Sequence, residues 1–308
     1  MKKFSIVVPV YNEPGLPDAV PRLLALEDSL PGYGLELVLV DDGSRDDTLA
    51  NLLALQKMHP TKLKVVQFTR NFGSMAAIQA GLSVATGDCV GVVSADMQDP
   101  PELFLQMIPH WEQGVKAVFA VRSDREDKTS DKLLSGAYYS LMRKFAIADF
   151  PEGGFDCFLV DRQVVSELDT IREKNTDLRS LVFWLGHHHV LIPYVRQRRE
   201  KGESKWTMAR KIKLFIDSFV AFSYVPIRLV SVLGLLFALA SFVYGLIVFV
   251  SWSMAGIKVE GWTALMIFIA FTAGVQMTML GVLGEYLWRA LDEARKRPAY
   301  VIERIFAD

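Results

Sequence analysis

Two long uncharged runs of apolar residues limit what this chain can fold into more than any other feature. They extend over residues 229–257 and 261–284, and only residues 258–260 lie between them. Each run reaches the roughly 20 residues that a helix needs to cross about 30 Å of hydrocarbon. Buried helices of a large soluble protein are the alternative, but such helices usually carry a polar stripe. The sequence therefore predicts a region, residues 226–288, with two transmembrane helices at about 228–252 and 262–287.

Basic residues flank this predicted helical hairpin at both of its ends. Because lysine and arginine accumulate at the cytoplasmic ends of membrane helices, both termini are predicted to lie in the cytoplasm, at the inner membrane. Residues 211–225 repeat apolar residues at helical spacing, which is typical of a helix lying in the membrane interface; packing on the soluble domain is the alternative. The flanking basic residues are Arg210, Lys211, Lys213, Arg228, Arg289, Arg295, Lys296 and Arg297.

The composition leaves room for one sizeable soluble domain before the hairpin. The chain has 308 residues, of which 22% are charged, and a formal net charge of −1. A near-neutral chain argues against nucleic acid as a partner. The two cysteines, Cys89 and Cys157, fall in the part predicted to be cytoplasmic, where thiols stay reduced, so neither a disulfide nor a cysteine metal site is expected.

Apolar strand patterns alternate with helical patterns in the first 120 residues, which is the signature of a parallel α/β sheet. Residues 1–210 are thus predicted to form an α/β domain, and residues 289–308 a cytoplasmic tail. In parallel sheets ligands bind beyond the carboxyl ends of the strands. The predicted strands are 4–10, 35–40, 64–68, 90–94 and 117–121, and the predicted helices between them are 17–29, 46–58 and 75–85.

Two familiar nucleotide-binding motifs are absent from the sequence. No Gly-x-Gly-x-x-Gly follows the first strand, which argues against a nicotinamide or flavin enzyme. The Gly-x-x-x-x-Gly-Lys-Ser/Thr loop is absent too, which argues against phosphoryl transfer from ATP by that route.

Carboxylates follow the first two strands, where a bound nucleotide would lie. Glu13 comes shortly after the first strand, and Asp41 and Asp42 end the second. An aspartate here can accept hydrogen bonds from a uracil ring or a ribose, and Gly43 permits a tight turn. The alternative is that these residues only turn the chain and that Ser44 caps the next helix.

Asp96 and Gln98 follow the fourth strand. In an extended segment they project to the same side and offer two hard oxygen ligands, which suit Mg²⁺ or Mn²⁺ carrying a pyrophosphate. An acidic turn before the helix that Pro100 opens is the alternative.

Taken in order, the motifs resemble those of family 2 glycosyltransferases that load a sugar onto a polyprenyl phosphate, such as bacterial undecaprenyl-phosphate glucosyltransferases and, more remotely, dolichol-phosphate mannose synthases. The resemblance covers nearly the whole chain, including the hairpin. The motifs that carry it are Val8-Pro9-Val10-Tyr11-Asn12-Glu13, Asp41-Asp42-Gly43-Ser44, Arg70-Asn71-Phe72-Gly73, Ala95-Asp96-Met97-Gln98-Asp99-Pro100, Gly202-Glu203-Ser204-Lys205-Trp206 and Gly281-Val282-Leu283-Gly284-Glu285-Tyr286.

The resemblance implies a GT-A fold, a nucleotide-diphosphate sugar as donor, uridine as its base, a divalent metal and inversion at the anomeric carbon. It places the metal on Asp96 and Gln98. It also implies a set of nucleotide-binding residues, which are Pro9, Tyr11, Asn12, Glu13, Asp41, Asp42 and Arg70.

The sequence departs from the family pattern at two places. Ser94 stands where the family usually has the first aspartate of Asp-Ala-Asp, which predicts a weaker metal site. The family's Gly-Asp-Phe-Arg has its counterpart near Asp156 only after a shift of one position, and the arginine has none. Asp156 is nevertheless predicted to be the catalytic carboxylate, because it lies in a glycine-framed apolar stretch where a loop can present it to the sugar. A turn or cap residue is the alternative.

Basic residues are expected to clamp the phosphate groups of both substrates. Arg122 and Arg125 follow the fifth strand, and Arg196 and Arg198 come before the membrane region. Arg199 and Lys205 are favoured, because they fall in the segment that resembles the family's Arg-x-x-Gly-x-Ser-Lys-Trp pattern. A run of basic residues that simply faces water is the alternative.

Three functions are compatible with the sequence. The first is synthesis of an undecaprenyl-phosphate monosaccharide, which implies a flippase and a downstream glycosyltransferase as functional partners. The second, a processive polysaccharide synthase, is disfavoured because two spans are too few for a polymer channel and the Gln-x-x-Arg-Trp pattern is missing. The third is a membrane nucleotide-sugar-binding protein without catalysis. Small residues in the second span, such as Gly274 and Gly281, are consistent with a homo-oligomer.

Overall fold

The chain folds into two compact units. One comprises residues 1–218 together with 298–308, and the other comprises residues 219–297. The computed structural model describes residues 1–124, Gly136, 140–144, 146–147, 150–151, 154–171, Glu173, 176–197, Val220, 222–223, 225–255 and 261–307.

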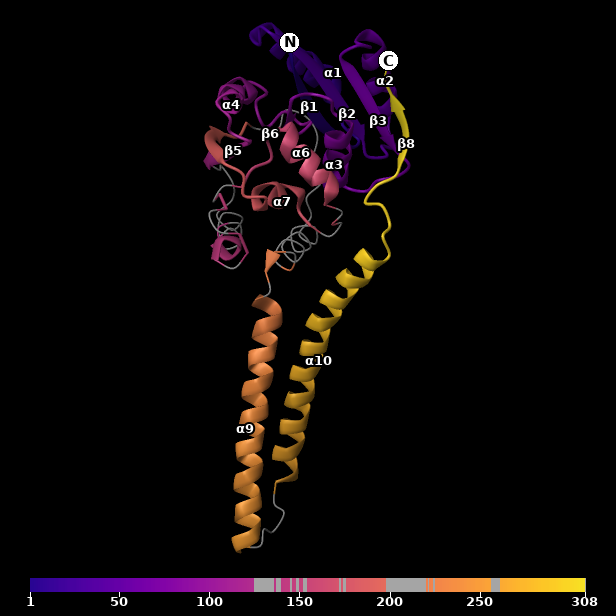
Figure 1. The fold of residues 1–308 in the computed structure, drawn as a ribbon. Coiled ribbons are helices and arrows are strands. Elements are labelled where there is room, and N and C mark those ends of the chain that lie inside the picture. The colour runs from indigo at the N-terminus through magenta and orange to yellow at the C-terminus, as the bar shows by residue number, and fades with distance from the viewer. Residues whose placement is uncertain are drawn as a thin grey trace. The chain divides into compact units, whose positions relative to one another are not determined.

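The first unit is built on a mostly parallel sheet (Figure 1). Within the described residues its eight strands follow the order β7-β5-β6-β4-β1-β2-β3-β8. β6 runs antiparallel to β4 and β5, β8 runs antiparallel to β3, and the remaining neighbours are parallel. The strands are β1 (Lys2–Val10), β2 (Tyr33–Asp41), β3 (Leu63–Phe68), β4 (Cys89–Val92), β5 (Ala117–Asp124), β6 (Phe158–Asp161), β7 (His189–Val195) and β8 (Ile302–Phe306).

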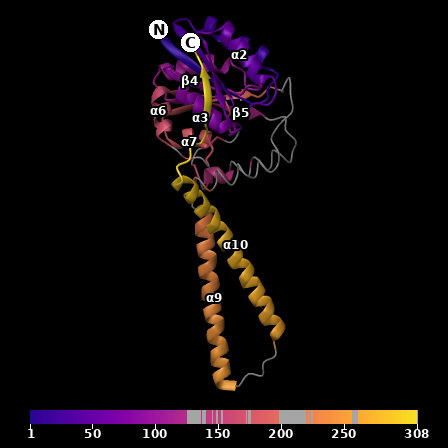
Figure 2. The same ribbon diagram turned by 90° about the vertical axis from the view of Figure 1, so that its right-hand side faces the viewer.

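Helices cover both faces of this sheet (Figures 1 and 2). Phe4 of β1 packs edge-on against Phe104 of α4, with ring centroids 5.3 Å apart. On the other face α3 approaches β1 so closely that a Cβ on Gly81 would lie 2.2 Å from the Val7 side chain. The helices are α1 (Leu16–Leu24), continued by the short 3₁₀ helix η1 (Ala25–Ser29), α2 (Thr48–Met58), α3 (Ser74–Val84), α4 (Leu103–Glu112), α6 (Arg162–Thr170) and α7 (Leu178–Trp184).

The five predicted strands and three predicted helices are all present, with shifted ends. β4 ends at Val92, two residues before the predicted end, and the predicted helix 17–29 is divided between α1 and η1. The sequence analysis predicted no strand after residue 121, whereas the structure adds β6, β7 and β8. These short strands lack a repeated strand–helix alternation, which is the pattern that identified the others.

The second unit consists of two long helices, α9 (Val225–Ala255) and α10 (Trp262–Ala294). They pack through Phe237 and Phe271, whose ring centroids are 5.7 Å apart, and the Tyr286 hydroxyl donates to the Ser223 carbonyl oxygen at 3.1 Å. In the part of the chain that the structure describes, one segment, Val225–Ile247 of α9, is long and apolar enough to cross a membrane. The predicted second span, in α10, stays a prediction.

Candidate active site

The functional residues that the sequence predicts and the structure describes gather at the carboxyl end of the sheet. Parallel strands β1, β2, β3, β4, β5 and β7 all end there. β6 is antiparallel, so its beginning, just after Asp156, lies at that same end. This is the position at which open α/β sheets bind ligands.

Backbone-anchored loops form the part of the site that follows β1 and β2. The Asn12 amide donates to the Ser44 hydroxyl at 3.0 Å, and the Arg45 amide donates to the Asn12 side-chain oxygen at 2.9 Å. The Glu13 amide donates to the Thr48 hydroxyl at 2.9 Å. The first two bonds join the loop after β1 to the loop after β2, and the third joins the loop after β1 to the start of α2, so these segments form one connected wall.

Asp42 connects this wall to the loop after β3. Its carboxylate accepts the amide protons of Phe72 at 2.6 Å and Gly73 at 2.9 Å. Burial nevertheless raises the pKa of Asp42 to about 6, because desolvation outweighs these two hydrogen bonds. The carboxylate is ionised at neutral pH and loses its charge in mildly acidic solution.

The neighbouring Asp41 is fully buried and offers an acceptor atom. Its Oδ1 accepts the Ser44 amide proton at 3.1 Å, whereas Oδ2 is buried and has no hydrogen-bond partner among the described residues. Burial raises the pKa of this carboxyl group above its usual value. A buried acceptor of this kind is costly unless a ligand satisfies it.

The remaining predicted nucleotide-binding residues lie around these two aspartates. Pro9 is in β1 opposite Val40 of β2, and Tyr11 follows β1 directly. Arg70 is exposed, with its guanidinium 4.1 Å from the centroid of the Phe72 ring. The structure thus brings the predicted nucleotide-binding set to one end of the sheet.

Gly43 leaves no room for a side chain in this wall. Its φ of +67° is in the left-handed region, and a Cβ here would lie 2.5 Å from the carbonyl carbon of Arg70. The loops after β2 and β3 can therefore approach this closely only with glycine at position 43.

The predicted metal ligands follow β4. Asp96 Oδ1 accepts hydrogen bonds from the Ser94 hydroxyl at 2.7 Å and from the Gln98 amide at 3.3 Å. The Gln98 side-chain nitrogen donates to the Gln197 carbonyl oxygen at 3.2 Å, which leaves its side-chain oxygen as a candidate ligand. Among the described residues no group of three or more His, Cys, Asp or Glu side chains could hold a metal by itself. One carboxylate and neutral oxygens fit a Mg²⁺-like ion that takes its other ligands from substrate phosphates and water.

Asp156 lies among three arginines, and we call these four residues the arginine cluster. Its carboxylate forms ion pairs with Arg122 of β5 and with Arg179 of α7. Arg196, which follows β7, is 3.8 Å away through its Nη2 atom. The Asp156 side chain keeps 25% of its surface exposed, so the cluster is partly open to solvent.

Two further carboxylates balance the charge of the arginine cluster. Asp177 accepts from Arg179 Nε at 3.0 Å, and Asp99 lies 3.9 Å from Arg196 Nε. The fully buried Asp99 also accepts the Tyr194 hydroxyl proton and, at 3.3 Å, that of Ser94. Ser94 thus connects the metal-ligand residues to the arginine cluster.

Two of the arginines predicted as phosphate clamps, Arg122 and Arg196, lie in the arginine cluster, and their role as clamps stays a prediction. Arg125, Arg198, Arg199 and Lys205 lie outside the described residues. Arg179 was missed, because nothing in its local sequence distinguishes it from an ordinary residue in the first turn of a helix. Its ion pair with Asp156 becomes visible only once α7 packs, through Phe183, against Phe119 of β5 and against Phe155.

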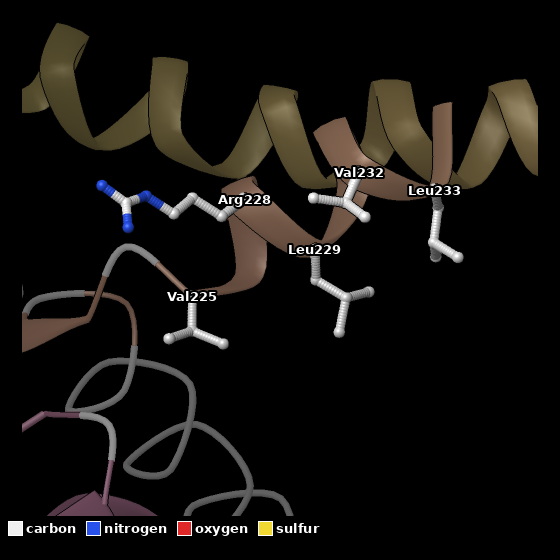
Figure 3. A pocket seen from close by; sticks show the side chains of 5 residues that line it. All are labelled: Val225, Arg228, Leu229, Val232 and Leu233. Atoms are coloured by element: carbon white, nitrogen blue, oxygen red, sulfur yellow. The ribbon is translucent and has the colours of Figure 1, made fainter. Parts of the chain in front are cut away.

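A separate hollow lies in the helical unit, along the first turns of α9. Figure 3 shows its lining, with the Arg228 side chain extending away from the apolar side chains of Val225 and Leu229. None of the predicted site residues lines it. The hollow therefore belongs to the apolar surface of α9.

Comparison with known proteins agrees with this arrangement. The model of the family "Glycosyl transferase family 2" matches residues 5–169. The chain is 36% identical to the uncharacterized glycosyltransferase YkcC of Bacillus subtilis, over 99% of this chain and 94% of that protein. It is 34% identical to the bactoprenol glucosyl transferase of Shigella phage SfII, over 98% of each chain.

A solved structure shows the same fold. It is glucosyl-3-phosphoglycerate synthase of Mycobacterium tuberculosis, in complex with Mn²⁺, uridine-diphosphate-glucose and phosphoglyceric acid. It matches with a TM-score of 0.50 and 15% sequence identity, covering 70% of this chain and 78% of the synthase. Sheet order, site position and sequence relatives lead to one conclusion: the chain belongs to glycosyl transferase family 2 and is a glycosyltransferase with a GT-A domain.

Proposed function

We propose that this glycosyltransferase moves one monosaccharide from a nucleoside-diphosphate sugar, with uridine as the base, to the phosphate of undecaprenyl phosphate, with inversion at the anomeric carbon. The observation that carries the proposal is the arginine cluster, which sits at the same end of the sheet as the nucleotide-binding loops. A site for two anionic substrates needs such cations next to the reacting atoms. Relatives named bactoprenol glucosyl transferases, similar over the full chain, support the lipid acceptor.

The proposed reaction is a single displacement. An oxygen of the acceptor phosphate attacks the anomeric carbon, a new C–O bond forms, and the bond to the nucleoside diphosphate breaks with both electrons leaving on that group. A phosphate monoester has a second pKa near 6, so at neutral pH the acceptor is largely a dianion that needs little activation. Asp156 orients this phosphate and takes its remaining proton when it is bound as the monoanion.

The arginines of the cluster have two roles in this proposal. Before substrates bind, the Asp156 carboxylate occupies Arg122 and Arg179. An incoming phosphate is a stronger acceptor for guanidinium groups than a carboxylate, because it offers more oxygens and more charge. When it engages the arginines, it weakens their hold on Asp156, which then faces the acceptor. Asp177 keeps Arg179 oriented meanwhile, through its bond to Nε.

Mg²⁺ or Mn²⁺ is the proposed cofactor. Asp96 and the side-chain oxygen of Gln98 would hold it, and the ion would neutralise the developing charge of the departing diphosphate. Ser94, in place of a carboxylate, supplies a hydroxyl that already donates to Asp96 at 2.7 Å. This hydrogen bond keeps the Asp96 carboxylate oriented.

The membrane topology follows from the helical unit. We propose that α9 and the uncharged part of α10, residues 262–284, both span the inner membrane, with the catalytic domain and both termini in the cytoplasm. Arg228 in the first turn of α9 and Arg289 near the end of α10 flank the apolar segments, as the positive-inside rule requires. The product would then need a flippase and a downstream transferase to reach a surface glycan. Association of copies through the helices is compatible with this arrangement.

The test is a transfer assay with purified protein in detergent. It contains undecaprenyl phosphate, Mg²⁺ or Mn²⁺, and in turn each of a panel of radiolabelled nucleotide sugars, and it measures label in the organic phase. We expect metal-dependent label from one donor, lost in Asp96→Ala and kept in Asp28→Ala, which removes an exposed carboxylate far from the site. Label that extends into long polymers would favour a processive synthase. Absence of label with every donor would favour a binding protein without catalysis.

A further inference from the structure

The last strand of the chain completes the catalytic sheet. β8 pairs with β3 in antiparallel register, with Phe306 opposite Val65 and Ile302 opposite Phe68. The Thr69 amide extends the pairing by donating to the Val301 carbonyl oxygen at 3.2 Å. Because β8 is antiparallel, the residues just before it lie at the carboxyl end of the sheet, where the site is. Figure 1 shows β8, in yellow, beside β3.

Tyr300, just before β8, packs against the end of β3 and against α3. Its ring stacks on that of Phe68, with centroids 5.3 Å apart and planes inclined by 8°. Its hydroxyl lies 3.3 Å from the Ser83 hydroxyl of α3. The tyrosine is therefore held on one side by the end of β3 and on the other by a helix of the same unit.

A series of ring contacts leads from Tyr300 to the nucleotide-binding loop. Phe68 is almost fully buried and meets Phe72 edge-on, with centroids 5.7 Å apart. Phe72 in turn supports the Arg70 guanidinium and donates its amide proton to Asp42. The position of the loop at residues 70–73 thus depends on packing that ends at Tyr300.

From these contacts we infer that Tyr300 is a positioning residue for the donor nucleotide, contributed by the segment that follows α10. By supporting Phe68, it fixes Phe72 and Arg70 and keeps the Phe72 and Gly73 amides on Asp42. This inference rests on the proposed function, since it concerns the nucleoside-diphosphate part of the same site. Tyr300 acts through its neighbours.

A purely structural role for β8 makes a different prediction. If the strand only covers the edge of β3, a change at Tyr300 lowers stability and leaves nucleotide affinity unchanged. If Tyr300 positions the loop, nucleotide affinity falls while the chemical step, which depends on the arginine cluster and the metal, keeps its rate. The separation of KM from kcat therefore distinguishes the two roles.

The experiment uses the full-length protein in detergent and titrates UDP in the presence of Mg²⁺. For Tyr300→Leu we expect the Kd for UDP to rise about three- to tenfold, the effect of losing one well-packed ring contact, with donor KM following and kcat within about twofold. Tyr300→Phe keeps the stack and should bind UDP nearly as the unchanged protein does. Tyr33→Leu is the matched control, because it removes a buried tyrosine at the opposite end of β2. It should lower the melting temperature without changing the Kd.

A second measurement needs no ligand. Hydrogen exchange of the Phe72 and Gly73 amides should be faster in Tyr300→Leu than in Tyr300→Phe or Tyr33→Leu. Unchanged exchange would overturn the inference. Equal UDP affinity in Tyr300→Leu and the unchanged protein would also overturn the inference. That result would not contradict the proposed function. If the unchanged protein binds neither UDP nor any other nucleoside diphosphate, the proposed donor class fails and the inference fails with it.

Discussion

The two halves of the active site are built by different kinds of contact. In the nucleotide half, backbone amides of Asn12, Glu13, Phe72 and Gly73 reach side-chain acceptors on neighbouring loops. In the acceptor half, long charged side chains meet one another around Asp156. Backbone contacts fix a position with little freedom, whereas arginine side chains can exchange one anion for another.

This difference suits the two substrates. A nucleotide is recognised by shape and hydrogen bonds, which calls for walls that are already in place. In the proposed reaction the acceptor phosphate arrives from the membrane and displaces the Asp156 carboxylate from its arginines. The loops of the nucleotide half are already in place, whereas the arginines of the acceptor half exchange one anion for another. Substitutions in the two halves should therefore have different effects.

Asp156→Asn should break the acceptor half alone. We expect kcat to fall by about 10²-fold, because the acceptor phosphate loses the carboxylate that orients it, while the affinity for UDP stays the same or rises because arginines are released. The melting temperature should fall too, since removing one partner leaves charges uncompensated. Assays of transfer, UDP binding and thermal unfolding check this.

Asp161→Asn is the matched control for Asp156→Asn. Asp161 is also ion-paired, with Lys116 at 3.0 Å, but it lies at the far end of β6. The Asp161→Asn variant should be less stable than the unchanged protein and should have the same kcat. A kcat for Asp156→Asn equal to that of this control would show that Asp156 only holds the arginines.

Gly43→Ala should break the nucleotide half alone. The methyl group would push the loop after β3 away from Asp42, because it would lie 2.5 Å from the Arg70 carbonyl carbon. We expect donor KM to rise about tenfold or more and the free energy of unfolding to fall by about 1–3 kcal/mol. Gly32→Ala is a fair comparison, since Gly32 has a φ of +92° but open space around it. It should lose stability without a change in KM, and equal KM values for the two variants would contradict the interpretation.

Lowering the pH should weaken binding of the donor and at the same time stabilise the folded protein. Both effects come from protonation of the Asp42 carboxyl group. The pKa of this carboxyl group is raised from 3.8 to about 6 in the folded protein, so the cost of its buried charge is fully present above pH 6 and declines as the pH falls from about 6 towards 3.8. A nucleoside group that donates to the carboxylate loses its acceptor over the same range. We expect the Kd for UDP to rise by at most about tenfold per pH unit below pH 6. Asp42→Asn should remove this pH dependence, and a profile unchanged in the variant would assign it to another group.

Ser94→Asp should produce the smallest effect, at the border between the two halves. A second carboxylate beside Asp96 would lower the Mg²⁺ concentration needed for half-maximal transfer, by about three- to tenfold. Without metal it would face Asp96 and Asp99, which now accept the Ser94 hydroxyl proton, so the metal-free protein should melt at a lower temperature. Ser94→Ala removes the hydroxyl group that donates to Asp96, and it should raise the Mg²⁺ concentration needed for half-maximal transfer. A half-maximal Mg²⁺ concentration that is the same in all three proteins would remove Ser94 from the metal site.

Sequence patterns predicted the nucleotide half better than the acceptor half. The loops after β1 and β2 lie next to strongly apolar strands, so the strand pattern alone brings Glu13 and Asp42 to one end of the sheet. Asp156 was predicted through a family resemblance and a shifted motif. Arg179 could not be predicted, because its partner is 23 residues away along the chain and only the packing of α7 brings them together. Tyr300 was missed for the same reason, with a separation of more than 200 residues from Phe68.

The place of β8 in the chain also governs how this protein is made. During synthesis the edge of β3 stays open while α9 and α10 leave the ribosome, since β8 is encoded after both helices. An unpaired strand edge invites pairing with other chains. In the proposed topology α9 and α10 enter the bilayer before the catalytic sheet closes, and a nascent chain stalled at that stage should be prone to aggregate at the membrane surface.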